Sequence, residues 1–390
     1  MGTRNIAAGI DLNREGTQIC YYNLETGDTV TAPMKIGNEE VSFRSILDEC
    51  EMQEDSFAED AEQKAQKQRR LEEQASDMFR QALATLGLTD PARQLKGLVI
   101  TMPQISVPVI ALLRAVCGRL GLDESRAFLQ DYRESFYYHT FYQKKELHAR
   151  GAGLFRFRGE QVTFYSLSQN PLTRPVTVTA VQNDPVSLGA DPAAWDQRFC
   201  ALAEEALRGG LYSSIYIMGD AFEQSLMPHA TAFLCKNGRK VFVVDRLFAR
   251  GACYAAREKT LESILNGYLF LGDDLVRSNI GMRMLVQGTE TWYPIVSAGV
   301  NWYAAGTSFS CLLAGEPELV FAVSAMDGSS RGEKRIDLSG IPKRPPKTTR
   351  LDVSLTFVSA GHCTVEVKDA GFGELFPSSH MVWREEWEDV

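Results

Sequence analysis

The stretch GIDLNREGTQICYY, residues 9–22, has the pattern of a β-hairpin. The apolar runs IAAGI and ICYY flank the polar turn NREG, and short apolar runs around a turn that contains glycine predict two paired strands. Such a hairpin can cradle a phosphate on its backbone N–H groups, or it can serve the fold alone. The sequence patterns in the rest of the chain are needed to choose between these two interpretations.

Strand and helix patterns alternate after this hairpin. The expected elements are one or two helices over 54–88, a strand over 96–103, a helix over 105–121, a strand over 127–132, a hairpin over 153–167, a helix over 195–211, a strand over 213–220 and a helix over 244–259. Strands that alternate with helices indicate an α/β fold. Two halves, each led by a hairpin and continued by helix and strand units, suggest an internal pseudo-duplication.

The pattern changes after about Phe270. The remaining apolar runs are short, such as LVFAVSAM and RLDVSLTFV, and Gly, Pro, Ser and Asp separate them. This pattern is typical of a mainly antiparallel β-sandwich, with a helix expected only over the last dozen residues. The boundary is expected between Gly267 and Asp274.

Composition excludes several classes of protein. The 390 residues are 44% hydrophobic and carry a net charge of -9, and no apolar run is long enough to cross a membrane. Asp11 interrupts the apolar start too early for a signal peptide, so a cytoplasmic protein is expected. The basic run KRPPKTTR reads as a turn, so no nucleic-acid partner is expected. The eight cysteines form no CxxC pair, which argues against a metal site.

The order of these parts resembles the actin-like ATPase superfamily, and most closely its DnaK-type heat-shock chaperones. The segments that carry the resemblance are the two hairpins GIDLNREGTQ and GLFRFRGEQVTFYSL, the strand LVITMP, the motif IYIMGD, the helix FARGACYAA and the stretch from residue 335 to residue 374. The last of these resembles the chaperone's substrate-binding sandwich.

The resemblance implies a two-lobed α/β nucleotide-binding-like domain at 1–267, a linker at 268–274 and a β-sandwich at 275–390. The upper subdomains are shortened, and the helical lid is missing.

The resemblance also implies where ATP or ADP would bind. The first hairpin would contribute Asp11, Asn13, Arg14, Thr17 and Gln18. Asn13 and Arg14 are bulkier than the residues expected at a phosphate-binding tip, although Arg14 can pair with a phosphate by its charge. Thr17 and Gln18 can donate hydrogen bonds.

The other implied cofactor-binding residues are Glu134, Gly219 and Asp220. Glu134 is either a site residue or a helix cap or ion-pair partner. Asp220 replaces a second glycine of the adenosine motif, and its carboxylate can bond a ribose hydroxyl. In the second hairpin Arg156 stands where the family has an acid, and its charge would repel magnesium.

These departures lead to the hypothesis that Arg156 pairs with Asp11 across the cleft in place of magnesium nucleotide. The alternative is that both side chains face solvent on their hairpins.

The function expected is that of a chaperone-like pseudo-ATPase that acts as a protein-interaction scaffold or regulator. It would have no catalytic residue, no metal, and no cofactor or only weakly bound ATP or ADP. A protein or peptide partner would bind the β-sandwich, where Trp292, Tyr293, Trp302 and Tyr303 either meet that partner or fill the core. The alternatives are an active ATP-dependent peptide-binding chaperone and an actin-like structural or assembly protein.

Overall fold

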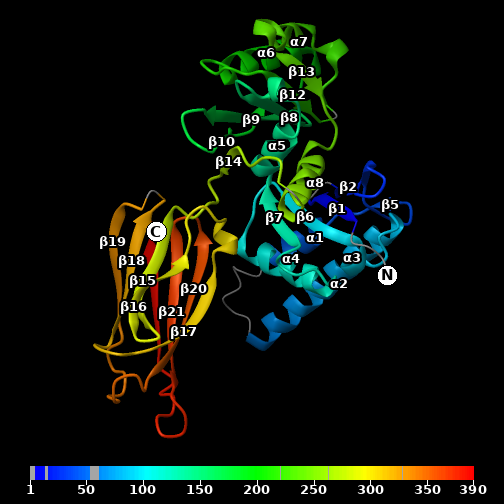
Figure 1. Cartoon of the computed structure of the whole chain (residues 1–390). Coiled ribbons are helices and arrows are strands. Elements are labelled where there is room, and N and C mark those ends of the chain that lie inside the picture. The colour runs from blue at the N-terminus through cyan, green and yellow to red at the C-terminus, as the bar shows by residue number, and fades with distance from the viewer. Residues whose placement is uncertain (1–4, 14–15, 53–60, 220, 262, 327) are drawn as a thin grey trace. The chain divides into compact units, whose positions relative to one another are not determined.

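The chain forms two compact units, Met1–Phe270 and Leu271–Val390 (Figure 1). The computed structural model describes residues 5–13, 16–52, 61–219, 221–261, 263–326 and 328–390. The unit boundary lies within the range expected from the sequence.

The first unit begins with a five-stranded sheet in the order β3-β2-β1-β6-β7. Its strands are β1 (Ile6–Asp11), β2 (Gln18–Asn23), β3 (Thr29–Pro33), β6 (Leu95–Met102) and β7 (Ala127–Asp131). β1 pairs antiparallel with β2 and parallel with β6. The pair β1 and β2 is the hairpin expected over residues 5–22.

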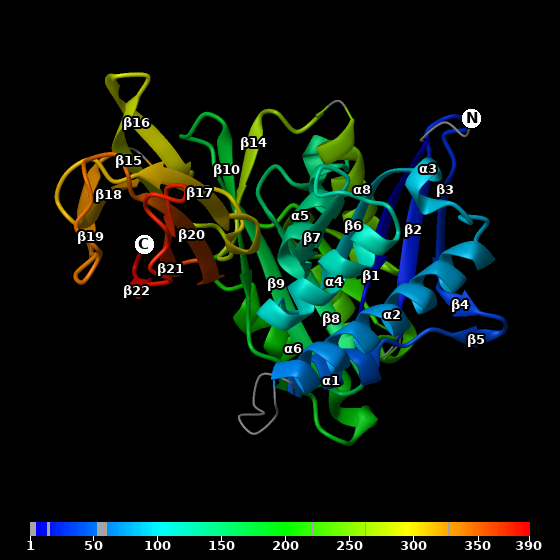
Figure 2. The same cartoon turned by 90° about the horizontal axis from the view of Figure 1, so that it is seen from below.

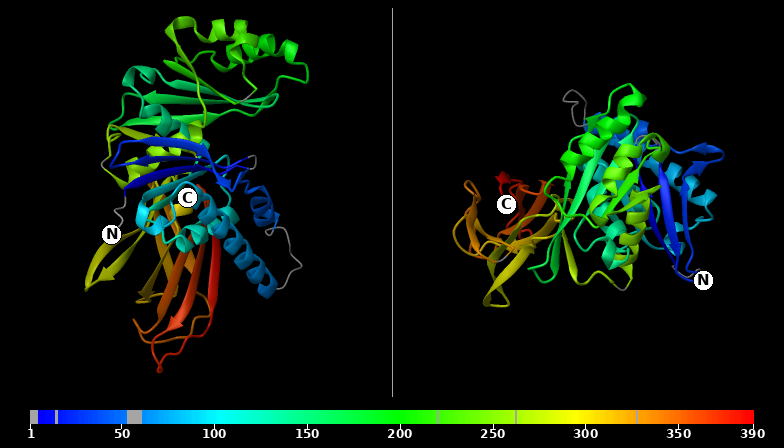
Figure 3. Two further views of the ribbon diagram at one scale, coloured as in Figure 1. Left: turned by 90° about the vertical axis from the view of Figure 1, so that its right-hand side faces the viewer. Right: turned by 90° about the horizontal axis from the view of Figure 1, so that it is seen from above.

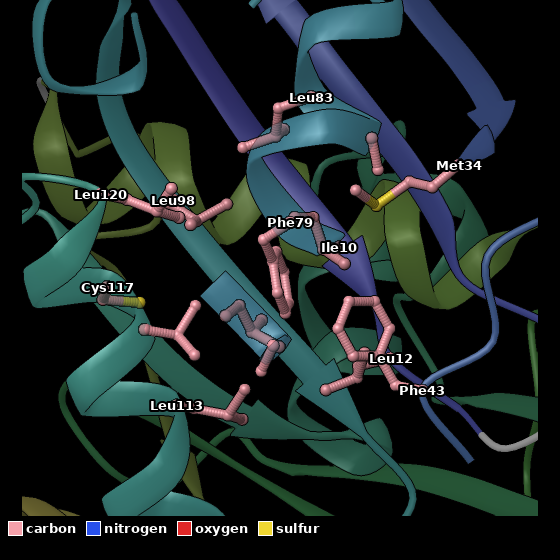
Figure 4. Close-up of a cluster of buried hydrophobic side chains, with 14 of the residues drawn as sticks. Ile10, Leu12, Met34, Phe43, Phe79, Leu83, Leu98, Leu113, Cys117 and Leu120 are labelled. Atoms are coloured by element: carbon pink, nitrogen blue, oxygen red, sulfur yellow. The ribbon is translucent and has the colours of Figure 1, made fainter. Parts of the chain in front are cut away.

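Helices cover one face of this sheet and enclose a large apolar core (Figure 4). The helices are α1 (Arg44–Met52), α2 (Ala61–Thr85), α3 (Pro91–Gln94) and α4 (Val107–Arg119), and the small strands β4 (Lys35–Ile36) and β5 (Glu39–Glu40) pair beside them. In Figure 4 Phe79 of α2 and Leu113 of α4 point toward Ile10 and Leu98 of the sheet. α4 starts after Ser106 with a proline in its first turn, which is compatible with a helix start.

The second half of this unit repeats the topology of the first. Its sheet has the order β13-β12-β8-β9-β10-β14, and its first five strands correspond to those of the first sheet. The elements are β8 (Ala152–Arg158), β9 (Gln161–Asn170), β10 (Val176–Gln182), β11 (Val186–Ser187), α6 (Trp195–Ala206), β12 (Ser214–Met218), α7 (Pro228–Leu234), β13 (Lys240–Val243) and β14 (Tyr268–Leu271). β8 pairs antiparallel with β9 and parallel with β12, as β1 does with β2 and β6. The expected pseudo-duplication is confirmed.

Each half ends in a helix that lies between the two sheets. α5 (Tyr132–Phe141) follows β7, and α8 (Leu247–Thr260) follows β13 (Figure 2). α8 packs on the first sheet so closely that a Cβ on Gly9 would lie 2.1 Å from the backbone nitrogen of Cys253. α5 contributes its aromatic side chains to the core of the second sheet. Each helix therefore covers the sheet of the other half.

The second unit consists of strands with one short 3-10 helix, η5 (Trp302–Ala304) (Figure 3). One four-stranded antiparallel sheet has the order β16-β15-β18-β19, and the other has the order β17-β20-β21-β22. The strands are β15 (Ser278–Val286), β16 (Thr289–Val296), β17 (Thr307–Leu312), β18 (Glu318–Ala325), β19 (Ser330–Asp337), β20 (Arg350–Ser359), β21 (His362–Gly371) and β22 (Val382–Glu388). The rings of Phe321 on β18 and Trp387 on β22 lie 5.1 Å apart and join the buried faces of the two sheets.

Two expectations need correction. The last dozen residues do not form a helix, because β22 pairs with β21 and buries Trp387 while its neighbours in the chain are exposed. This alternation has the period of a strand. The expected linker at 268–274 begins as β14, an edge strand of the second sheet of the first unit.

Candidate functional site

Asp11 and Tyr132 connect the first sheet to α5. Asp11 is the last residue of β1, and its carboxylate accepts a hydrogen bond of 2.7 Å from the Tyr132 hydroxyl. Tyr132 is the first residue of α5 and is fully buried, and Asp11 is buried as well. The polar end of the first hairpin is thus bonded to a phenol of the chain itself.

Arg156 lies over the ring of the same phenol. Its guanidinium carbon is 4.9 Å from the centre of the Tyr132 ring and 5.7 Å from that of Phe248 on α8. The Tyr132 and Phe248 rings are stacked, with their centres 3.7 Å apart and their planes within 6°. The ring centre of Tyr165 on β9 lies 5.9 Å from that of Phe248. Asp11, Tyr132, Arg156, Tyr165 and Phe248 form what we call the Tyr132 cluster. Its members come from both sheets and from both helices between them.

The expected direct pair between Arg156 and Asp11 is wrong. Both residues are described, and no ion pair joins them; the ring of Tyr132 bonds the carboxylate and faces the guanidinium. A phenol can do both because its hydroxyl donates while its ring face attracts a cation. The alternative, in which both side chains face solvent, is also wrong, because Asp11 is only 6% exposed.

The protonation states of the Tyr132 cluster follow from burial and charge. Burial raises the pKa of Tyr132 well above its usual value, and the Asp11 carboxylate raises it further. Burial opposes the charge of Arg156, but the Tyr132 and Tyr165 hydroxyls and Asp11 more than compensate, so the pKa of Arg156 lies above its usual value. The phenol therefore keeps its proton, and the guanidinium keeps its charge.

Some polar groups of the first hairpin bond within the protein, and two buried side-chain oxygens do not. The Asn13 side-chain oxygen accepts a hydrogen bond of 3.0 Å from the Gly16 backbone nitrogen. The Thr17 backbone nitrogen donates to the Val41 carbonyl at 2.9 Å, and Gln18 pairs with Asp11 across the hairpin. The Thr17 hydroxyl and the Gln18 side-chain oxygen are buried and have no hydrogen-bond partner among the described residues. Arg14 lies outside the described residues.

Glu134 lies in the first turn of α5, below the Asp131 cap. Its backbone nitrogen donates to the Asp131 carboxylate at 2.8 Å, and its own carboxylate accepts from the Lys259 ammonium at 2.9 Å. Lys259 belongs to α8, so this ion pair joins the two helices between the sheets. These contacts are those of an ion-pair partner, one of the two roles considered for this acid.

Gly219 follows β12 directly and has a φ of 119°, which favours glycine. A Cβ at this position would lie 2.3 Å from the carbonyl oxygen of Phe157 on β8. Close packing inside the second sheet is therefore enough to require a glycine here. Asp220 lies outside the described residues.

The Tyr132 cluster does not have the chemistry of a magnesium site. Magnesium sites use carboxylates and water, and the Tyr132 cluster instead holds a buried guanidinium. Among the described residues, no group of three or more histidine, cysteine, aspartate or glutamate side chains is arranged to hold a metal ion. Tyr132 and Phe248 belong to no motif of the sequence, and only their positions at the starts of helices that follow strands could have pointed to them.

The second unit contains a groove of about 1170 Å³. Trp292 and Tyr293 line it and are 47% and 41% exposed. Trp302 and Tyr303 are buried in the core instead. Trp302 and Tyr303 therefore fill the core, while Trp292 and Tyr293 lie at the surface of the groove.

None of the helices in the described part of the chain has both the length and the apolar character that a membrane span requires.

Comparisons with solved structures return distant matches. A Bacteroides thetaiotaomicron protein described as having an actin-like ATPase fold and unknown function is 10% identical, with a TM-score of 0.34, and the match covers 64% of this chain and 96% of that one. The (R)-2-hydroxyglutaryl-CoA dehydratase component A of Acidaminococcus fermentans is 9% identical, with a TM-score of 0.38 and coverages of 66% and 99%. These likenesses concern the fold alone. No curated protein matches the chain.

Two family models match the chain, and their limits agree with the two units. Residues 275–388 match a domain of unknown function, DUF8552. Residues 34–273, more than half of the chain, match the C-terminal model of a family of unknown function, DUF5716. The chain therefore belongs to the DUF5716 family.

Proposed function

We propose that the first unit is an actin-like ATPase fold that no longer uses nucleotide, and that the protein is a chaperone-like pseudo-ATPase acting as an interaction scaffold. In this proposal the second unit is a β-sandwich that binds a protein partner. The observation that carries the proposal is the Tyr132 cluster, in which one buried phenol bonds Asp11 through its hydroxyl and faces Arg156 with its ring.

Electrostatics supports the loss of magnesium nucleotide. Arg156 keeps its charge in a buried setting. A cation within about 4 Å of a guanidinium is repelled by about 4 kcal/mol per unit of its charge at an effective dielectric constant near 20. Asp11, the carboxylate that would attract such an ion, is already bonded to Tyr132.

Packing supports a fixed arrangement of the two halves. The Tyr132 cluster takes side chains from β1, β8, β9, α5 and α8, and Glu134 and Lys259 add an ion pair between the helices. An ATPase of this kind would need its halves to move around a ligand. Here the contacts between the halves are made by the protein's own side chains.

Thermal unfolding of the full chain with and without millimolar ATP and magnesium tests the proposal. A ligand that binds only the folded state stabilises it by about 2.7 kcal/mol at one hundred times its dissociation constant, which raises Tm by several degrees. We expect no magnesium-dependent rise. A clear rise would overturn the proposal and favour an active ATP-dependent chaperone.

The variant Arg156→Asp serves as the second arm of this experiment. It restores an acid at the position where the resemblance places one. A magnesium-dependent rise of Tm in this variant alone would identify Arg156 as the residue that excludes the ion. Filaments that form with rising protein concentration would instead favour the actin-like structural protein.

A further inference from the structure

The groove of the second unit lies beside two edge strands. β16 is the outer strand of one sheet and β17 is the outer strand of the other, and residues of both line the groove. The rings of Tyr293 on β16 and Phe309 on β17 lie 6.1 Å apart. Backbone N–H and C=O groups on the outer side of an edge strand have no partner within the sheet.

β17 is the more open of the two edges. β16 contains Pro294, which has no N–H to donate, and proline is a common protection of edge strands. β17 has no proline, and its half-buried Phe309 and Cys311 alternate with exposed Ser308 and Ser310. An added strand would meet this alternation with apolar side chains at every second position.

The floor of the groove is apolar, and two basic side chains line it beside the last residues of β17. Met282, Met284 and Leu319 line the groove. Lys347 and Arg350 also line it, and neither forms an ion pair with any described residue. The nearby carboxylates of Glu318 and Glu333 both pair with Arg335, and Glu316 is the one lining carboxylate that no described cation neutralises. The lining as a whole has three cations and four carboxylates, and Lys347 and Arg350 are the two lining cations that pair with no described carboxylate.

We propose that this groove binds an extended segment of a partner protein by strand addition to β17, with alternate apolar side chains on the groove floor and an acidic end beside Lys347 and Arg350. This inference rests on the proposed function, whose partner it specifies. A lipid chain would also suit the apolar floor, but it cannot bond the free backbone groups of β17, whereas a polypeptide can.

Fluorescence anisotropy of the full chain with a labelled peptide tests the proposal. The peptide alternates valine with threonine and ends in aspartates. We expect saturable binding that is lost when alternate backbone nitrogens are methylated, because methylation removes the N–H donors that strand pairing needs. Equal binding of the methylated peptide would overturn strand addition.

Charge reversal on the protein provides the matched test. Arg350→Glu is expected to weaken binding of the aspartate-ended peptide about tenfold, or about 1.4 kcal/mol, and to strengthen binding of a lysine-ended one. Arg384→Glu on β22, the opposite edge strand of the same sheet, should leave both unchanged. Equal effects of the two variants would overturn the placement of the peptide.

Two further measurements separate the remaining occupants. Displacement of the peptide by dodecanoate at lower concentration than by unlabelled peptide would assign the groove to a lipid. Self-association that Arg350→Glu abolishes would assign it to a second copy of the chain.

Peptide affinity that changes with magnesium ATP would overturn the proposed function and leave the groove assignment intact. Absence of peptide binding, with no ATP-dependent rise of Tm, would overturn the groove assignment alone.

Discussion

Tyr132 is the residue that links a carboxylate of the first sheet to a guanidinium of the second. Its hydroxyl bonds Asp11 and its ring faces Arg156, so a single side chain serves two charged partners. A hydrogen bond to a charged group contributes about 1.5–3 kcal/mol, and a desolvated cation–π contact contributes about 2 kcal/mol. Substitution of Tyr132 can separate the contribution of the hydrogen bond from that of the cation–π contact.

Tyr132→Phe removes the hydroxyl and keeps the ring. We expect the free energy of unfolding to fall by about 1.5–3 kcal/mol, because the buried Asp11 carboxylate loses a donor. Urea unfolding followed by circular dichroism gives this value. Tyr293→Phe, which removes an exposed hydroxyl, is the control and should change stability by less than about 0.5 kcal/mol. Equal stability of the two variants would show that the Asp11 contact contributes nothing.

Arg344 and Asp369 form a second buried charged contact, in the second unit. Their bidentate pair has hydrogen bonds of 2.9 and 2.8 Å, and both side chains are almost fully buried. Burial opposes the charge of Asp369, but Arg344 and the Ser379 hydroxyl and backbone nitrogen together hold its pKa well below its usual value. The basic run KRPPKTTR thus supplies an internal ion pair.

The depressed pKa of Asp369 predicts acid sensitivity. A carboxyl whose pKa is lower in the folded state stabilises the fold above its unfolded pKa of about 3.9, and this contribution is lost as pH falls below that value. Tryptophan fluorescence during urea unfolding is the measurement, because Trp292, Trp302, Trp383 and Trp387 lie in the second unit. Asp369→Asn should destabilise at neutral pH by about 3–5 kcal/mol and flatten the acid dependence.

The exposed pair of Arg335 and Glu318 is the matched control for this experiment. Glu318→Gln should cost no more than about 1 kcal/mol, as is usual for surface pairs. An Asp369→Asn variant that resembled it would contradict the buried role of Asp369.

At the scale of elements, α5 and α8 pack against each other through a glycine. A Cβ on Gly251 of α8 would lie 1.9 Å from the carbonyl oxygen of Ser135 on α5. Backbone on both sides leaves no flexible side chain to move away. The absence of a side chain at this position thus sets the distance between the two helices.

Gly251→Ala is therefore expected to destabilise the protein by about 1–3 kcal/mol through overpacking. Gly118→Ala in α4 is the matched control, because no atom lies within 4 Å of the added Cβ. Alanine in place of glycine inside a helix stabilises by about 0.5–1 kcal/mol. Differential scanning calorimetry of both variants gives the two shifts in Tm, which should have opposite signs. Shifts of the same sign would contradict the tight crossing.

The sequence predicts an element well where the spacing of its apolar residues matches that of a strand or a helix. The hairpins at 5–22 and 153–167 and the repeated α/β order followed from apolar runs and turns. The expected helix over the last dozen residues is wrong, because exposed residues alternate with less exposed ones along VWREEWE. The pairing of this segment with β21 decides its conformation. The Tyr132 cluster could not be predicted, because it joins residues from 11 to 248 that come together only when both sheets have formed.

At the scale of the whole molecule, the chain contains two units that match two different family models. The first unit contains the Tyr132 cluster, and the second contains the groove. The proposed function and the groove assignment can consequently be tested separately.

Each of the helices α5 and α8 covers the sheet of the other half, and this limits where the chain can be divided. A break after Arg150 would leave one fragment with the first sheet and α5, and another with the second sheet and α8. Each fragment would expose the sheet face that its missing helix covers, so neither should be soluble by itself. Co-expressed, the two fragments should assemble into one particle. The duplicated halves behave in this respect like subunits of an obligate dimer that share a single chain.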